Sequence, residues 1–128
     1  MNAKSTALAG LACLLTGCTT MRNSTTTEKP MIVHSVFFKL KHDKGSQAEA
    51  GFLAQAAELS GIPGVENFQT LKETSPKNNF DFGLSMEFAD QAAYDGYNTH
   101  PDHVRFVQEV WLKEVVEFQE IDYVPIAD

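Results

Sequence analysis

The chain has 128 residues, of which 43% are hydrophobic and 21% are charged. This length suits one domain of about 100–150 residues, which excludes a multidomain enzyme with two sizeable cores. Seventeen acidic residues against ten lysines and arginines give a net charge of −7, with no run of more than two like charges. Nucleic-acid binders need clustered positive charge, so this balance excludes a nucleic-acid partner.

Residues 1–17 have the composition of a secretory signal peptide. One basic residue, Lys4, precedes an apolar stretch at residues 7–15, which is the order of an n-region and an h-region. The stretch is too short to cross a hydrocarbon core, which takes about 20 helical residues. It ends in Leu-Thr-Gly-Cys at Cys18, which resembles a bacterial lipobox, where the cysteine is lipidated and becomes the mature N-terminus. The alternatives are an ordinary signal peptide and an N-terminal helix that contains a cysteine.

Residues 18–30 are polar and threonine-rich without apolar periodicity, which is typical of a flexible tether. The two cysteines are Cys13 and Cys18, so a chain cleaved before Cys18 has no pair for an internal disulfide. In Gram-negative lipoproteins an Asp after the cysteine commonly signals inner-membrane retention, and Thr19 stands there instead. We therefore expect a domain at residues 31–128 that is lipid-anchored in the bacterial cell envelope, at the outer membrane.

The rest of the chain alternates between strand and helix patterns. Period-two alternation predicts the strands, and apolar residues three and four apart predict the helices. The expected elements are strands at 32–41, 65–71, 80–88 and 115–124, a helix at 46–60, a short helix at 90–97, and a helix from 101 to 114. The order β-α-β-β-α(α)-β predicts an α+β, ferredoxin-like fold, with an antiparallel sheet and helices on one face.

Two of the strands define the buried face of the sheet. That face is expected to carry Ile32, His34, Val36, Phe38 and Leu40 from the first strand and Phe80, Phe82, Leu84, Met86 and Phe88 from the third. The other face is mixed in character, because it includes Val33, Phe37, Gly83 and Ser85. Pairing two such faces would bury both, so a homodimer is the simplest expectation.

Local signals bound the expected helices. Ser46 with Glu49 is a capping-box pattern at the start of the first helix. Asp90 is a cap for the short helix, and Pro101 ends it, because the residue before a proline avoids the helical region. The helix that follows is amphipathic, with His103 on its apolar stripe.

Five segments follow the pattern of a known family. They are VHSVFFKLK at 33–41, IPGV at 62–65, DFGLSMEF at 81–88, YNTHPDH at 97–103 and DYVP at 122–125. Together they resemble the stress-responsive dimeric α/β-barrel (Dabb) domain family, in one register over about residues 31–125. The resemblance implies the ferredoxin-like fold and a dimer in which two sheets pack into a barrel. It implies no single activity, since similar domains include a plant polyketide cyclase, assembly-forming proteins and many of unknown role.

His34, Tyr97 and His103 are the candidate functional residues. Periodicity places both histidines on apolar faces, so we expect them in one pocket between the sheet and the helices. In the cyclase that the chain resembles, the matching His removes a proton beside a carbonyl and the matching Tyr polarises that carbonyl. The resemblance thus makes His103 a candidate general base and Tyr97 a candidate hydrogen-bond donor, without a cofactor. The alternative interpretation is that Tyr97 and His103 are hydrogen-bonded core residues at the corner between the helices.

Two classes of function therefore remain open. One is a tethered, dimeric small-molecule-binding or stress-related module that holds an apolar ligand without turnover. The other is a cofactor-independent cyclase, isomerase or lyase acting on a carbonyl compound. The chain departs from the cyclase at Phe82, where the cyclase has a further pocket histidine, and this departure favours the binding module by predicting a less polar pocket.

Other polar residues are weaker site candidates. His100, Asp102 and His103 suggest a metal site, but zinc usually needs three or four ligands and Pro101 interrupts the helical spacing. A capping or hinge role is the alternative, and no metal is expected. His42 lies in a polar turn and is expected to be solvated. The sequence shows no Gly-rich phosphate loop, Ser-His-Asp arrangement or dinucleotide fingerprint.

Overall fold

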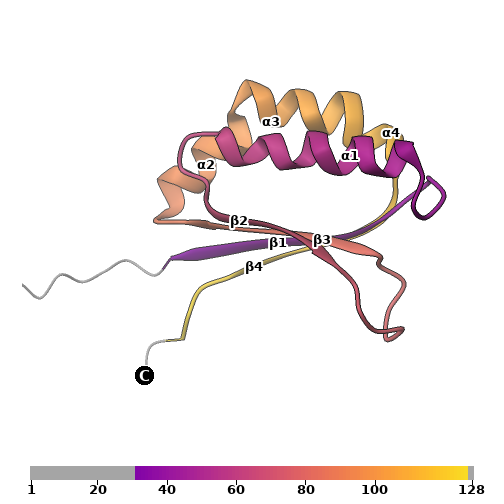
Figure 1. The fold of residues 1–128 in the computed structure, drawn as a ribbon. Coiled ribbons are helices and arrows are strands. Elements are labelled where there is room, and N and C mark those ends of the chain that lie inside the picture. Colours follow the sequence, from indigo (N-terminus) through magenta and orange to yellow (C-terminus); the bar gives the residue numbers. More distant parts are fainter. Residues whose placement is uncertain (1–30, 127–128) are drawn as a thin grey trace, which may run out of the picture.

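The computed structural model describes residues 31–126, which form a sheet layer and a helix layer (Figure 1). The elements are β1 (Ile32–Leu40), α1 (Gln47–Ala57) with the 3₁₀ turn η1 (Glu58–Gly61), β2 (Glu66–Lys72), β3 (Phe82–Phe88), α2 (Gln91–Thr99), α3 (Pro101–Phe106) with the π-helical turn η2 (Val107–Trp111), α4 (Leu112–Glu114) and β4 (Val115–Tyr123). The expected signal peptide, tether and lipidation site at Cys18 lie outside the described residues. Among the helices that are described, none combines the length and apolar character of a membrane span.

The four strands form one antiparallel sheet in the order β2-β3-β1-β4. The helices all lie on one face of this sheet (Figure 1). This arrangement confirms the ferredoxin-like α+β fold that the order of elements predicts. The central strand β1 pairs with β3 on one side and β4 on the other, so His34 lies opposite Met86 and also opposite Asp122.

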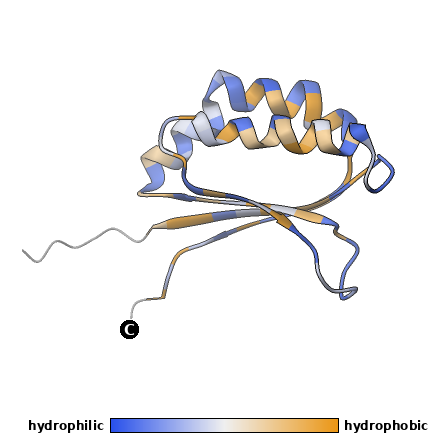
Figure 2. Cartoon of the chain, viewed as in Figure 1, coloured by the Kyte–Doolittle hydropathy of each residue, from blue (hydrophilic) through white to orange (hydrophobic). Residues whose placement is uncertain are grey.

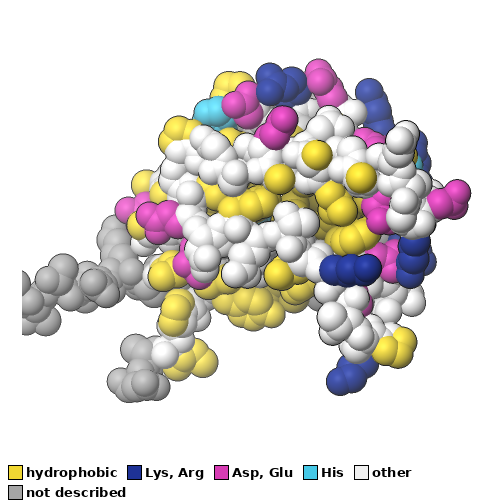
Figure 3. Space-filling view, in the orientation of Figure 1, with side chains coloured by type: hydrophobic (Ala, Val, Ile, Leu, Met, Phe, Trp, Pro, Cys, Tyr) yellow, Lys and Arg dark blue, Asp and Glu magenta, His cyan; other side chains and the backbone are white. Residues whose placement is uncertain are grey.

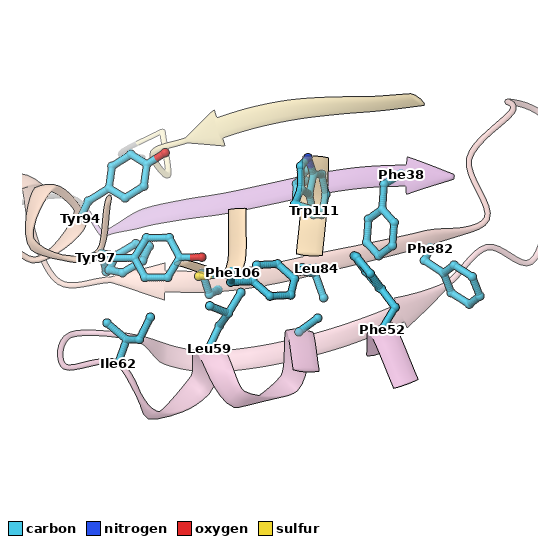
Figure 4. Packing of buried hydrophobic residues seen from close by; sticks show 14 of the residues in the cluster. Phe38, Phe52, Leu59, Ile62, Phe82, Leu84, Tyr94, Tyr97, Phe106 and Trp111 are labelled. Carbon is cyan, nitrogen blue, oxygen red and sulfur yellow. The ribbon is translucent and has the colours of Figure 1, made fainter. Parts of the chain in front are cut away.

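The core lies between the sheet and the helices, on the faces that period-two alternation predicts. The largest fully buried side chains are Phe38, Phe52, Leu84, Met86 and Phe88. Aromatic rings from both layers meet there: the Phe38 ring centroid is 5.4 Å from that of Phe52 and 5.1 Å from that of Trp111 (Figure 4). Burial of one such side chain contributes about 1.5–3 kcal/mol, so this cluster holds α1 and the C-terminal helices on the sheet.

The helix N-caps that the sequence predicts at Ser46 and Asp90 are confirmed. The Ser46 hydroxyl accepts the Glu49 N–H at 3.2 Å, and the Asp90 carboxylate accepts the Ala93 N–H at 2.9 Å. Each bond satisfies a backbone donor that the first helical turn leaves unpaired. His100 caps α3, since its Nδ1 accepts the Asp102 N–H at 3.1 Å. This is the capping role that the sequence offers as the alternative to a metal site.

Two expectations need correction. Strand β3 begins at Phe82 and not at residue 80, because the Asn78 side chain accepts the Phe80 N–H at 2.9 Å and closes a turn there. This connection between β2 and β3 is mostly hydrophilic (Figure 2). The expectation of a solvated His42 is wrong, because its Nε2 is 2.6 Å from Glu114 Oε1. The chain returns beside the end of β1 at this point, where residue 41 donates its N–H to the Glu114 carbonyl at 2.9 Å.

The sheet face that points away from the helices is uncovered in the single chain. Hydrophobic side chains gather along this side of the molecule (Figure 3). Phe37 and Gly83 are cross-strand partners there, and the Phe37 ring lies 3.2 Å from the position that a Cβ on Gly83 would take. A larger residue at 83 would displace the ring. The face also includes Leu71, which is 40% exposed, and Tyr123, which is 53% exposed.

Candidate functional site

A pocket of about 280 Å³ opens between the sheet and the helices on the β4 side of the core. Its walls are mostly apolar and include Val36, Leu59, Leu84, Met86, Phe106 and Trp111. The three candidate residues from the sequence all line it: His34 from β1, Tyr97 from α2 and His103 from α3. Glu120 from β4 lines it as well. The pocket therefore combines an apolar body with four polar groups.

His34 is held in one orientation by a carboxylate and a phenol. It is 4% exposed, and its Nδ1 lies 2.6 Å from Asp122 Oδ1 and 3.0 Å from the Tyr94 hydroxyl. The same hydroxyl donates to Asp122 Oδ2 at 2.9 Å. A carboxylate only accepts hydrogen bonds, so Nδ1 must carry the hydrogen. The Nε2 atom of His34 is then left to face the pocket.

Tyr94 is part of this cluster although it does not line the pocket. Burial raises its pKa, and the neighbouring Asp122 carboxylate raises it further by disfavouring the phenolate. Tyr94 therefore stays a hydrogen-bond donor throughout the physiological range. Its single hydroxyl hydrogen goes to Asp122, so the phenol braces the carboxylate that orients His34.

Tyr97 and His103 stack against each other in the pocket wall. Their ring centroids are 4.3 Å apart with planes inclined by 36°. His103 Nδ1 lies 3.2 Å from the Asn98 carbonyl oxygen, which can only accept, so Nδ1 carries the hydrogen and Nε2 has no hydrogen-bond partner within residues 31–126. Burial lowers the pKa of His103, and the bond to the Asn98 carbonyl offsets this in part. Burial also raises the pKa of Tyr97, so at neutral pH the pair is a neutral imidazole and a neutral phenol.

Three residues of this site were missed in the sequence: Tyr94, Glu120 and Asp122. Glu120 and Asp122 alternate on β4, so period two places them on one face, but it does not say which face points to the helices. The register decides this, since Asp122 lies opposite His34 and Glu120 opposite Val36. Tyr94 precedes Tyr97 by three residues and shares its helix face, which is a signal that could have been used.

Phe82 does not act on the pocket as expected. Its ring packs 5.9 Å from that of Phe38, at the end of the core away from Tyr94 and Tyr97 (Figure 4). It is not among the residues that line the pocket, so it does not make the pocket less polar. The pocket-facing positions of β3 are instead Leu84 and Met86.

His100, Asp102 and His103, the metal-site candidates of the sequence, are spread around the start of α3. His100 Nδ1 lies 3.9 Å from Asp102 Oδ2, while the Asp102 carboxylate also accepts from Arg105 at 2.9 Å. His103 turns toward the pocket. Within residues 31–126, no group of three or more His, Cys, Asp or Glu side chains is placed to hold a metal ion.

Comparisons with known proteins agree with this fold. A Dabb family protein of Mesorhizobium loti with a ferredoxin-like fold is 54% identical, over 77% of this chain and 100% of that one, with a TM-score of 0.76. A protein of unknown function from Bacteroides fragilis, described as dimeric, is 21% identical over 75% of this chain and 97% of that one, with a TM-score of 0.58. Hydroxynitrile lyase from Passiflora edulis is 15% identical over 77% of this chain and 96% of that one, with a TM-score of 0.68. These last two likenesses show the shared fold alone.

A search of curated proteins found no significant match. The sequence profile described as the Stress responsive A/B Barrel Domain (Dabb), however, matches residues 32–125, which span all four strands and the helices between them. The chain belongs to the stress responsive A/B barrel domain family.

Proposed function

We propose that this protein is a dimeric small-molecule-binding domain, tethered to the bacterial cell envelope by a lipid on Cys18. The observation that carries the binding proposal is the pocket, which joins apolar walls to a few convergent polar groups. Ligand sites in proteins have this composition, and a volume of about 280 Å³ suits a compact molecule. The ligand that fits has an apolar body and one polar group that reaches His34, Tyr97 or His103.

The dimer is proposed because one sheet face is uncovered and apolar in part. Phe37, Leu71 and Tyr123 lie on that face. Solved proteins of this fold from Bacteroides fragilis and Thermobifida fusca are described as dimeric. A second copy of the same face would cover these side chains and remove them from water.

The binding proposal is tested by filling the pocket. Val107 lines it from η2, whereas Val104 is three residues earlier on α3, is 38% exposed and does not line it. Val107→Phe should abolish saturable binding of small apolar alcohols and ketones in calorimetry, and Val104→Phe should retain it. Equal binding by both variants would contradict a ligand site in this pocket.

A second candidate function is proton transfer at a carbon beside a carbonyl group. The observation that favours it is the stacked Tyr97–His103 pair, with a neutral imidazole whose Nε2 is free and a phenol that remains protonated. His103 Nε2 would take the proton, and the Tyr97 hydroxyl would donate to the oxygen that becomes negative. The enzymatic activity of the Passiflora edulis relative supports a catalytic role for a protein of this fold.

A further inference from the structure

Most of the polar groups around the pocket are hydrogen-bond acceptors. His34 Nδ1 is committed to Asp122 and His103 Nδ1 to the Asn98 carbonyl, so the Nε2 atom of either ring is an acceptor whenever that ring is neutral. Glu120 adds a carboxylate, which also only accepts. Among the lining side chains, the donors are the Tyr97 hydroxyl and the Trp111 indole N–H. A ligand that satisfies this set must itself supply hydrogens at its polar end.

Glu120 and His34 present two acceptor atoms that one donor group can bridge from the pocket side. Glu120 Oε1 lies 3.6 Å from His34 Nε2, which is beyond an ordinary hydrogen bond. Two acceptors at this separation repel each other when His34 is neutral. A hydroxyl group beside the pair would donate its one hydrogen to either atom, and an ammonium group could donate to both. The Glu120 side chain is 51% exposed, so this donor position lies at the mouth of the pocket.

The charge at the mouth is negative. Among the described residues that line the pocket there is no Lys or Arg. Two carboxylates, Glu120 and Asp122, flank the single imidazole of His34, so the group stays net negative in either protonation state of the ring. The negative charge of Glu120 also acts on the neighbouring titratable groups. It favours the protonated forms of Tyr94, Tyr97 and His103, and in His103 it opposes the larger effect of burial, which lowers the pKa.

From this arrangement we propose that the pocket takes a compact apolar molecule whose polar end is a hydrogen-bond donor, an alcohol or a protonated amine, and that it rejects carboxylates and phosphates. This proposal rests on the proposed binding function and specifies which class of ligand the same pocket accepts. An anionic end would be repelled by Glu120 in the lining and by Asp122 on the Nδ1 side of His34, with no cation among the lining residues to offset them. An apolar body would lie against Leu84, Met86 and Trp111.

The test uses three probes with one apolar body: cyclohexylmethanol, cyclohexylmethylamine and cyclohexanecarboxylate. Trp111 lines the pocket and is the only tryptophan of the chain, so its fluorescence reports occupancy at neutral pH. The alcohol and the amine should bind the full-length protein about tenfold or more tightly than the carboxylate. In Glu120→Gln the ratio of the alcohol affinity to the carboxylate affinity should fall by about fivefold, because the variant lacks one carboxylate charge.

Glu117→Gln is the matched control. It removes one negative charge from the same strand, but Glu117 pairs with Lys39 and lies on the opposite face of the sheet. This variant should keep the wild-type ratio between alcohol and carboxylate. A carboxylate that binds the wild-type protein as tightly as the alcohol would overturn the inference. An equal change of the affinity ratio in Glu120→Gln and Glu117→Gln would overturn it as well. If no probe gives a saturable response, the proposed binding function fails together with the inference.

Discussion

His34 Nδ1 and Asp122 Oδ1 are 2.6 Å apart, although 88 positions of the sequence separate the two residues. They are cross-strand partners in the pairing of β1 with β4, so the register of that pairing creates the contact. Tyr94 joins them from α2 and completes a buried hydrogen-bonded group of imidazole, carboxylate and phenol. This group orients the free nitrogen of His34 toward the pocket.

Removal of the Tyr94 hydroxyl should destabilise the fold measurably. Tyr94→Phe keeps the ring but leaves Asp122 without one of its donors, so the free energy of unfolding should fall by about 1.5 kcal/mol. Ser60→Ala is the control, because it removes an exposed hydroxyl on the helix layer, and its effect should stay within about 0.5 kcal/mol. Urea denaturation followed by circular dichroism measures both. Equal losses would mean that the hydroxyl of Tyr94 has no special role.

The buried site of His103 should make stability depend on pH. Its pKa is lowered in the folded protein, so in the unfolded chain the residue takes up a proton as the pH falls through about 6.5, while in the folded protein it stays neutral to lower pH. The unfolded chain then binds more protons. The stability associated with His103 is therefore complete above about pH 6.5 and is lost as the pH falls below it. Urea midpoints across this range should fall less steeply in His103→Gln than in wild type, and parallel curves would contradict the burial effect.

If the protein catalyses proton transfer, His103 and Tyr97 should control its rate. His103→Gln should slow the exchange of the α-carbon proton of bound ketones with deuterated solvent by about 10²–10⁴-fold, since it removes the base. Tyr97→Phe should slow it as well, because the oxygen that becomes negative loses its donor. The wild-type rate should rise with pH through the lowered pKa of His103 and then level off. NMR measures the exchange, and a wild-type rate equal to that of buffer for every ketone that binds would exclude this function.

The uncovered sheet face should form the dimer contact. Light scattering should give twice the mass of the chain at micromolar concentration. A stable interface buries at least about 1,000 Å², and the uncovered face of a four-stranded sheet is the surface that we expect to supply it. Phe37→Glu places a charge on that face and should give monomers. Val104→Glu, on an exposed site of the helix layer, should remain dimeric. A wild-type monomer at this concentration would show that the face is not an interface between copies.

Attachment to the envelope should depend on Cys18. Cys18→Ala removes the only thiol in the lipobox-like position, so the protein should lose its label from a fatty-acid probe and leave the membrane fraction. Cys13→Ala is the matched control, because this cysteine lies within the apolar stretch that would be removed with the signal peptide. It should keep both the label and the location. Unchanged labelling in Cys18→Ala would exclude the lipoprotein interpretation.

The element order and the buried face of the sheet could be predicted from the sequence because both depend on local periodicity. Alternation along β1 and β3 follows from backbone geometry that repeats every two residues, so it identifies His34 and Leu84 as buried without any knowledge of the neighbouring strands. The caps at Ser46 and Asp90 are equally local, since each side chain bonds to a backbone group three residues away.

The rest of the site was decided by tertiary structure alone. Glu120 reaches the pocket, and Tyr94 and Asp122 reach His34, through the register between β1 and β4 and the packing of α2 on the sheet, and no local pattern encodes either. Phe82 shares a strand face with Leu84, yet its position at the far end of the core excludes it from the pocket lining. Periodicity assigns a residue to a face. Only the packing of distant segments decides what that residue meets there, because contacts across strands and layers depend on how the whole chain closes.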